Sequence, residues 1–241
     1  MATNRTVDID RFSDSKKRLL ERFLRGEAAR QNWEAPLERH QPGDTIPLAP
    51  SQQQVWLHAQ MAPGVPAYNE PVTVHYRGNL DGAALRRTFR EIQRRHEIWR
   101  TTIASVDGQV VQAVHPELDV PVPLTDLTAL PEERREQEAL RIATSDARRP
   151  FDLGLGPLWR AQLVKMATDY HRLYVTAHHL LIDGVGIYRV LLPELAAIYE
   201  AFSKGLPSPL PEPRYQYADY AIWQKRLLDD DSTAPQMEFW R

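Results

Sequence analysis

The chain has 241 residues, of which 42% are hydrophobic and 26% are charged, and its formal net charge at pH 7 is −2. This composition gives no electrostatic reason to expect binding to nucleic acid or to an anionic membrane, and the length allows one large domain or two small ones. The chain contains no cysteine, which excludes disulfides, thiolate metal sites and a cysteine nucleophile.

The first 45 residues are predicted to be a leader or linker that carries one short helix. Residues 13–25 place apolar side chains on one helical stripe, Gly26 follows, and a polar, proline-containing stretch comes next. An irregular N-terminal part of the main domain is an equally good interpretation. Because no apolar stretch is typical of a signal peptide or a membrane span, a cytoplasmic location is the default expectation.

From residue 46 to residue 241 the pattern is that of one folded unit. Hydrophobic periodicity predicts five helices and alternation predicts three strands, while Asp107-Gly108 predicts a hairpin between "WRTTIASV" and "QVVQAV". The helices are expected at 49–61 with a cap at Ser51, 81–97, 131–150, about 186–203 and 217–228, and the strands at 71–78, 158–166 and 172–179. Without a strict βαβ rhythm, this order indicates an α/β or α+β domain, with an open mixed sheet and flanking helices.

The segment "AHHLLIDGVG" at 177–186 concentrates polar side chains at the end of a predicted strand. Alternate side chains of a strand share a face, so His179 is expected on the face of Val175 and His178 on the opposite face. Two neighbouring histidines on a strand therefore cannot converge on one substrate atom. At most one of them is expected to carry out chemistry.

His179 is the better candidate for a general base. At the end of a strand, on an apolar face, desolvation favours its neutral imidazole, which can accept a proton. Asp183 and Gly184 then open a turn into a helix, whose first N–H groups suit a developing negative charge. The alternative interpretation is a pair of core histidines beside a turn. The position at a strand end, where open sheets tend to place ligands, favours function.

Three other kinds of site fit the sequence poorly. Zinc normally takes three or four protein ligands, and the remaining histidines are scattered along the chain. A dinucleotide loop would need glycine where Arg189 stands, and no GxSxG nucleophile motif is present. A group-transfer enzyme built on this segment is therefore expected to work by direct attack, without an acyl-enzyme.

At this point the motifs resemble a known family. "HHLLIDG" (178–184) resembles the HHxxxDG signature of nonribosomal peptide synthetase condensation domains, which are relatives of the chloramphenicol acetyltransferase fold. Further motifs agree in order: "LAPSQQQVWL" (48–57), "RRHEIWRTTI" (94–103), "FDLGLGPLWR" (151–160) and "YADYAIW" (217–223). Trp99 and Ile103 stand where the second of these motifs usually has leucine and phenylalanine. The resemblance covers residues 48–241 and implies the N-terminal lobe of that fold.

The resemblance implies amide formation in the biosynthesis of antibiotics and other secondary metabolites. The α-amine of an aminoacyl thioester on one carrier protein attacks an acyl or peptidyl thioester on another. Both substrates arrive on phosphopantetheine arms, so no cofactor or metal is expected on the chain itself. The implied partners are the donor and acceptor carrier proteins, a C-terminal lobe and neighbouring synthetase domains, with no nucleic acid or membrane.

The resemblance also implies roles for individual residues. His179 is implied to be the catalytic residue nearest the amine, Gly184 to contribute its backbone, His178 to be structural, and Asp183 to hold the loop through an arginine ion pair. Because an α-amino group titrates at about 7.7–8.0, His179 is expected to position the amine or to take its proton after attack. The other residues expected to support the site are Arg95, Arg100 and Trp223.

Two departures from the family pattern shape these expectations. The chain stops at "QMEFWR", inside what is predicted to be the next helix, so the second lobe is expected to be missing and the isolated lobe to be inactive. The stretches "DGVGIYRVLL" and "VPAYNEPVTV" are more similar to members that accept an acyl chain from a polyketide synthase, which implies a hybrid subtype.

Two other functions remain open from the sequence. One is a coenzyme A-dependent acyltransferase of the same superfamily with a free acceptor. The other is a non-catalytic module that docks carrier proteins or partner enzymes, although condensation-like domains of that kind have usually lost the HHxxxDG residues. A basic run on the 81–97 helix could meet an acidic carrier protein, or it could be a solvated helix face. It consists of Arg86, Arg87, Arg90 and Arg94.

Overall fold

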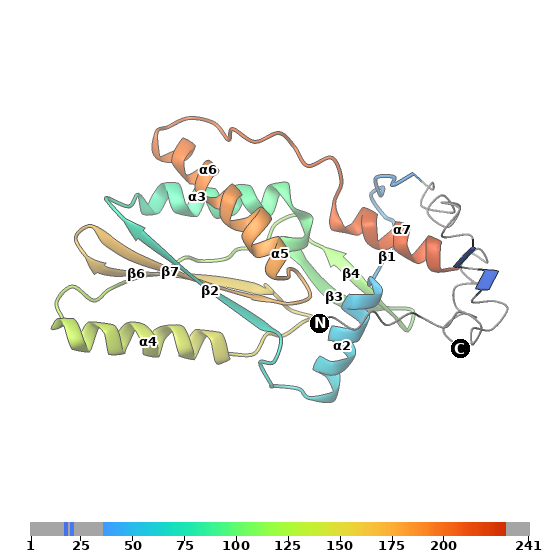
Figure 1. Cartoon of the computed structure of the whole chain (residues 1–241), viewed down its shortest axis with the longest axis horizontal. Coiled ribbons are helices and arrows are strands. Elements are labelled where there is room, and N and C mark those ends of the chain that lie inside the picture. The colour runs from blue at the N-terminus through green and yellow to red at the C-terminus, as the bar shows by residue number, and fades with distance from the viewer. Residues whose placement is uncertain (1–16, 19, 22–35, 230–241) are drawn as a thin grey trace, which may run out of the picture.

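The computed structural model describes residues 17–18, 20–21 and 36–229 (Figure 1). The helix predicted over 13–25 lies largely outside these residues, as does the "QMEFWR" end. The elements in chain order are β1 (Ile46–Pro47), α2 (Pro50–Met61), β2 (Asn69–Arg77), α3 (Gly82–Arg95), the 3₁₀ turn η2 (Glu97–Arg100), β3 (Thr101–Val106), β4 (Gln109–Val114), β5 (Leu124–Asp126), α4 (Glu132–Arg148), β6 (Trp159–Ala167), β7 (Tyr170–His178), α5 (Gly184–Gly186), the π-helical turn η3 (Ile187–Leu191), α6 (Leu192–Ser203) and α7 (Tyr217–Asp229). Within the described part, no helix has the length and apolar character needed to cross a membrane.

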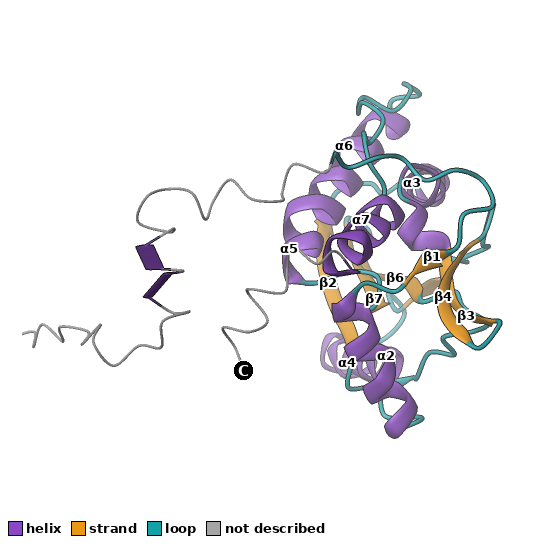
Figure 2. Ribbon diagram, turned by 90° about the vertical axis from the view of Figure 1, so that its right-hand side faces the viewer, coloured by secondary structure: helices purple, strands orange, loops and turns teal. Residues whose placement is uncertain are grey.

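The strands form two sheets. The larger sheet has the order β2-β7-β6-β5, in which β5 and β6 run parallel and the other neighbours run antiparallel. The smaller sheet has the order β1-β4-β3 and contains the predicted hairpin, whose turn residues Asp107 and Gly108 have φ values of 51° and 78°. The predicted mixed sheet with flanking helices is therefore confirmed, and the hairpin belongs to a separate sheet beside it (Figure 2).

Helices cover both faces of the larger sheet. Helices α3 and α6 lie on one face and α4 lies on the other (Figures 1 and 2). Along β7, Leu173 and Val175 join the core under α3 and α6, whereas Tyr174 joins the core under α4. Strand β7 is thus central and buried on both faces, and its buried residues include the polar side chains of Thr176 and His178 as well as apolar ones. The candidate site begins where this strand ends.

The cap of α2 differs from the sequence prediction, and the helix expected over about 186–203 is divided into α5, η3 and α6. Helix α2 begins at Pro50, so the predicted cap at Ser51 is wrong, and Ala49 holds the capping position. Proline suits the first helical position because it has no N–H to satisfy. The side chain of Gln52 then accepts a hydrogen bond from the Ala49 N–H at 3.0 Å, as in a capping box. Helix α3 is capped by Asp81, which accepts from two backbone N–H groups.

Residues 36–45 contact the main body of the fold. The backbone N–H and the ring Nδ1 of His40 lie 2.8 and 2.6 Å from Oδ1 of Asp219 in α7. Arg226, also in α7, lies 3.4 Å from Glu38. Part of the region predicted to be a leader therefore contacts α7, while a domain boundary at residue 45 stays a prediction.

Candidate active site

The signature segment starts at the end of the central strand β7. The ladder between β2 and β7 continues one step past His178, because the His179 N–H donates to the Tyr68 carbonyl oxygen at 2.8 Å. A turn follows, closed by a hydrogen bond of 2.9 Å from the Leu181 N–H to the His178 carbonyl. The chain then enters α5 at Gly184. This arrangement fixes the backbone of both histidines by sheet hydrogen bonds.

His178 is the buried histidine of the pair, with 6% of its surface exposed. Its Nδ1 accepts a hydrogen bond of 3.2 Å from the Leu180 N–H, and its ring lies 6.1 Å from the Tyr68 ring and 6.0 Å from the Phe151 ring, between centroids. Burial, together with the nearby His179, lowers the pKa of His178 to about 4. A neutral, packed and hydrogen-bonded imidazole fits a structural role.

His179 lies one residue beyond the strand, and 35% of its side chain is exposed. The expectation that His179 is the desolvated histidine is therefore wrong, because burial falls on His178, which packs against Tyr68 and the Phe151 loop. The Nδ1 atom of His179 is nevertheless buried, 3.2 Å from Oε1 of Glu70, without hydrogen-bond geometry. The exposed surface of the His179 side chain therefore lies away from Nδ1.

Asp183 caps the helix that follows the turn. Its Oδ1 accepts a hydrogen bond of 2.7 Å from the Gly186 N–H. The arginine ion pair implied by the resemblance is not formed within the described part of the chain, because the adjoining helix start satisfies the carboxylate instead. Asp183 still fixes the loop, but it does so by capping.

The two glycines of the loop differ in their surroundings. A Cβ atom added at Gly186 would lie 2.7 Å from Cγ1 of Ile182, so the loop cannot accept a side chain there without a shift. A Cβ atom at Gly184 would meet nothing within 4 Å. Gly184 thus leaves open space at the helix start, whereas Gly186 is required by the packing of this lobe.

The motif arginines lie away from the histidines. Arg95 is 3% exposed, and its Nε lies 3.1 Å from Oε2 of Glu194 in α6. Arg100 donates to the carbonyl oxygen of His115 at 2.5 Å. The structure therefore connects Arg95 to the helix that continues from the signature loop, while Arg100 joins η2 to the end of β4.

Trp223 also lies outside the histidine cluster. It packs in α7 beside Tyr220, with 5.9 Å between ring centroids. The 217–223 motif forms the start of α7. Gln216, the residue just before this motif, donates a hydrogen bond of 2.8 Å to the Arg95 carbonyl oxygen and so attaches α7 to the end of α3. The 94–103 and 217–223 motifs therefore meet in the fold.

Three residues around the signature were missed by reasoning from sequence. Gln52 in α2 is 4% exposed and donates to the Leu180 carbonyl oxygen at 3.0 Å, which ties α2 to the turn after the histidines. Tyr68 and Glu70 border His179, with the Tyr68 and His179 rings nearly parallel at 12°. The position of Gln52 three residues into a helix was a usable capping signal, whereas the contacts of Tyr68 and Glu70 depend on strand pairing.

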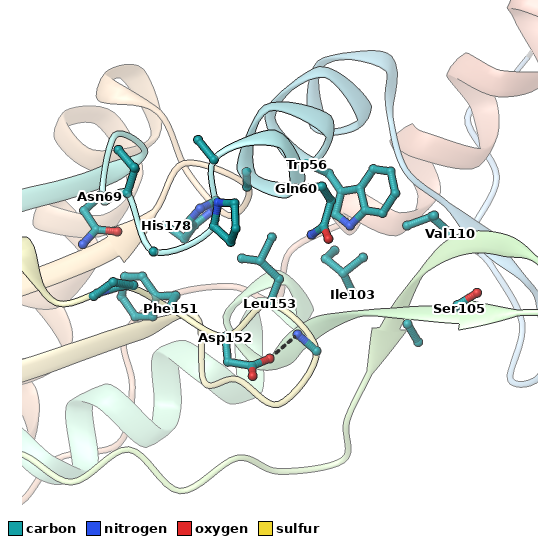
Figure 3. Close-up of a pocket in the computed structure, with 18 residues that line it drawn as sticks. Trp56, Gln60, Asn69, Ile103, Ser105, Val110, Phe151, Asp152, Leu153 and His178 are labelled. Atoms are coloured by element: carbon teal, nitrogen blue, oxygen red, sulfur yellow. Dashed lines mark hydrogen bonds between the residues drawn. The ribbon is translucent and has the colours of Figure 1, made fainter.

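A cavity of about 430 Å³ adjoins the buried histidine (Figure 3). Its walls come from α2, the β3–β4 hairpin and the loop after α4, and the labelled side chains of Trp56, Phe151 and Leu153 lie around it with His178. His179 is not among its lining residues. The described residues include no group of three or more histidine, aspartate or glutamate side chains placed to hold a metal ion.

The chain matches known proteins over most of its length. The family model "Condensation domain" matches residues 43–241. The chain is 38% identical over 198 residues to chondramide synthase cmdD of Chondromyces crocatus, covering 82% of this chain and 5% of that protein. It is 34% identical over 230 residues to phosphinothricin tripeptide synthetase PhsC of Streptomyces viridochromogenes, covering 95% of this chain and 21% of that protein. The chain thus spans a small part of the length of these relatives.

Solved structures agree with these matches. The starter condensation domain of rhizomide synthetase RzmA superposes with a TM-score of 0.75 at 22% identity, covering 82% of this chain and 47% of that one. The X-domain in its complex with OxyB from teicoplanin biosynthesis gives a TM-score of 0.72 at 31% identity, covering 86% of this chain and 44% of that one. The chain thus spans less than half the length of these solved chains. From the fold, the signature at the end of β7 and the family match over 43–241, the chain belongs to the condensation-domain family.

Proposed function

We propose that this chain supplies the N-terminal lobe of a domain that forms amide bonds in nonribosomal peptide synthesis. In this reaction an acyl or peptidyl thioester on a donor carrier protein is attacked by the α-amine of an aminoacyl thioester on an acceptor carrier protein. The observation that carries the proposal is the partly exposed His179, held at the end of the central strand beside a buried, neutral His178.

The chemistry follows from the position of His179. A useful fraction of an α-amine that titrates at about 7.7–8.0 is already neutral at pH 7, so deprotonation before attack is not the difficult step. His179 positions the amine and accepts its proton when the tetrahedral intermediate forms. The backbone N–H of Gly184 starts a helix and has no helical acceptor, so it is available to the developing oxyanion.

The second half of the site is proposed to come from a C-terminal lobe. Large apolar side chains are exposed at the start of the helix after the signature loop, where Val185 is 68% exposed and Tyr188 is 67% exposed. Exposed apolar side chains this close together in the chain are typical of a surface that another part of the protein covers. The lobe alone is therefore proposed to be inactive.

Carrier proteins are the proposed partners, with both substrates on phosphopantetheine and no cofactor held by the lobe. The direct test is the intact mass of an aminoacyl-loaded acceptor carrier after mixing with an acyl-loaded donor carrier and the domain extended by its second lobe. A parallel reaction replaces both carriers with acyl-coenzyme A and the free amino acid, and its amide product is measured by mass spectrometry of the small molecules. Product from the two-carrier reaction alone supports the proposal. Equal product from the coenzyme A reaction with the free amino acid supports the acyltransferase alternative instead.

The hybrid subtype is a finer proposal. Tyr68 and Glu70 of the "YNEP" segment border His179, and "DGVG" forms the start of the helix after the signature turn, so we propose that these two segments affect which donor is accepted. In competition between a polyketide-type acyl donor and a peptidyl donor on the same carrier, we expect preferential consumption of the polyketide-type donor. Preference for the peptidyl donor would remove the hybrid assignment and leave amide formation intact.

A recruitment module is the second candidate, favoured by the similarity to an X-domain whose solved structure is a complex with OxyB. Such a module binds a partner without forming product. The same intact-mass experiment separates the two functions, because a domain with both lobes that binds loaded carriers but makes no amide would favour recruitment. His178, His179, Asp183 and Gly184 are all present in this chain, which favours catalysis.

A further inference from the structure

Glu70 is the charged side chain closest to His179. Its Oε1 lies 3.2 Å from Nδ1 of His179, and the two side chains are 38% and 35% exposed. The Nδ1 atom itself is buried and has no hydrogen-bond partner in the present geometry. A small rotation of either side chain would make this contact a hydrogen bond, because the distance already lies near the hydrogen-bond range.

Strand register explains why the two residues meet. Glu70 lies opposite Ala177 in the antiparallel ladder, and His179 is two residues beyond Ala177 on the same face. Diagonal neighbours of this kind are within reach of long side chains. Asn69 fixes the start of β2, because its side-chain amide donates to the carbonyl oxygens of Ala147 and Arg149 at 2.7 and 2.9 Å.

A second neighbour restricts the imidazole from the side. The Tyr68 ring lies nearly parallel to the His179 ring, with 6.3 Å between centroids. The hydroxyl of Tyr68 lies 2.5 Å from Nδ1 of His58 in α2. Tyr68 is therefore held by α2 while its ring limits the orientations of His179. The carboxylate and the ring together leave the Nε2 side of the imidazole as its open side.

We propose that Glu70 is a positioning residue for His179, which holds the proton on Nδ1 and leaves Nε2 unprotonated as the acceptor for the substrate amine. This inference rests on the proposed function. In the reaction, nitrogen forms the new bond to the thioester carbon, the thiolate of the donor arm leaves, and the amine proton passes to Nε2 of His179. The carboxylate of Glu70 stabilises the imidazolium that results.

The direct test is the tautomer of His179 in the domain containing both lobes. Ring ¹⁵N chemical shifts of histidine-labelled protein report which nitrogen carries the proton, and the His179 signals are assigned by their loss in His179→Gln. We expect the proton on Nδ1 in the wild type and in Glu70→Gln, whose amide oxygen can still accept. We expect Glu70→Ala to shift the proton toward Nε2, the nitrogen that is protonated preferentially in the neutral side chain of free histidine in water.

Kinetics give a second readout. Glu70→Ala is expected to lower kcat for amide formation about tenfold with an unchanged KM for the acceptor carrier, a smaller loss than in His179→Ala because the pair is partly exposed to solvent. Glu70→Gln is expected to restore most of the rate. The matched control is Glu138→Gln, a partly exposed carboxylate that is paired with Arg141 on α4. Melting temperatures of all variants verify folding.

These experiments distinguish failure of the positioning role of Glu70 from failure of the proposed function. A wild-type His179 with its proton on Nε2 would overturn the positioning role even if amide formation is normal. A rise in KM alone would also overturn it, since Glu70 would then bind the acceptor instead of orienting His179. If no amide forms in the wild type, the proposed function fails, and the tautomer still decides whether Glu70 orients His179.

Discussion

Arg95 and Glu194 form an ion pair at the contact between α3 and α6, with 3.1 Å between Nε and Oε2. Arg95 is 3% exposed and Glu194 is also bonded by His96 Nε2 at 2.8 Å. Burial opposes ionisation of Glu194, but the hydrogen bonds from Arg95 and His96 outweigh it and lower its pKa below the usual 4.5. The motif arginine therefore acts by fixing α6, the helix that follows the signature loop.

Removal of one partner from this pair is expected to destabilise the fold strongly. Arg95→Met leaves Glu194 with one fewer donor, and loss of a partner from a buried pair typically costs about 3 kcal/mol or more. The measurement is urea unfolding at pH 7. The double variant Arg95→Met/Glu194→Met is expected to recover part of the loss. A double variant less stable than Arg95→Met would contradict the ion-pair role of Arg95.

His178 is expected to make the fold sensitive to mild acid. Its pKa falls from the ordinary 6.5 to about 4 in the folded protein, first because of burial and then because of His179. Because the unfolded state then binds a proton more readily, stability is full above pH 6.5 and is lost as the pH falls toward 4. A pKa difference of this size corresponds to about 3 kcal/mol.

The measurement is the free energy of unfolding between pH 7 and pH 4, in the wild type and in His178→Phe. The variant is expected to lose less stability over this interval, whatever its stability at pH 7. The control is His75→Phe, which removes a histidine from an exposed contact with Tyr170. Identical slopes in the wild type and His178→Phe would show that His178 does not titrate as the burial predicts.

Alanine at Gly184 and at Gly186 is expected to have different consequences for stability. Gly186→Ala places a Cβ atom 2.7 Å from Ile182, and overpacking of this kind costs about 1–3 kcal/mol. Gly184→Ala meets no atom within 4 Å and is expected to leave the free energy of unfolding within about 1 kcal/mol of the wild type. Thermal unfolding checks both. A Gly184→Ala protein that is the less stable of the two would contradict the geometry of the loop.

Two of the four arginines on the basic face of α3 contact other side chains, and two are exposed without an ion pair in the described part of the chain. Arg94 is paired with Glu91 and Glu212, and Arg87 lies over the Phe202 ring at 4.5 Å. Arg86 and Arg90 are exposed and have no ion pair within the described residues. If this face docks an acidic carrier protein, these two arginines are the ones available to it.

Charge reversal tests that docking role. Arg86→Glu/Arg90→Glu is expected to weaken carrier binding several-fold at low salt and less at high salt, since screening reduces the contribution of exposed charges. Affinity is measured by titration of the loaded carrier. Arg134→Glu on α4, outside the basic face, is the control. Carrier affinity that does not change on reversal of Arg86 and Arg90 would identify the basic run as a solvated helix face.

Much of the fold could be predicted because its signals are local. The Asp107-Gly108 turn, the alternation along β2 and the stripe of α3 each lie within one short stretch of sequence. The sequence motif at 217–223 includes Asp219, but the sequence did not indicate which residue Asp219 contacts. The buried carboxylate, 1% exposed, is hydrogen-bonded to His40, 179 positions earlier in the chain. No local pattern indicates such a contact.

The site itself was predicted less completely, for the same reason. The sequence identified the signature histidines and their separate faces, yet burial was assigned to the wrong one. Burial of His178 depends on the Phe151 loop, and the surroundings of His179 depend on the register between β2 and β7. Gln52 reaches Leu180 across 128 positions. These contacts depend on which strands and helices lie next to each other. The hydrophobic periodicity of the sequence predicts single elements but does not show how they pair.

The measurement that tests the central claim most directly is the single-turnover rate of amide formation between loaded carriers. It compares the wild-type domain, His179→Ala and His178→Phe, each with both lobes present and corrected for its folded fraction. We predict that His179→Ala loses about 10²–10⁴ in rate with an unchanged melting temperature, while His178→Phe stays within about tenfold of the wild type. Full rate in His179→Ala, or a greater loss in His178→Phe, would contradict the assignment of His179 as the residue that acts on the amine.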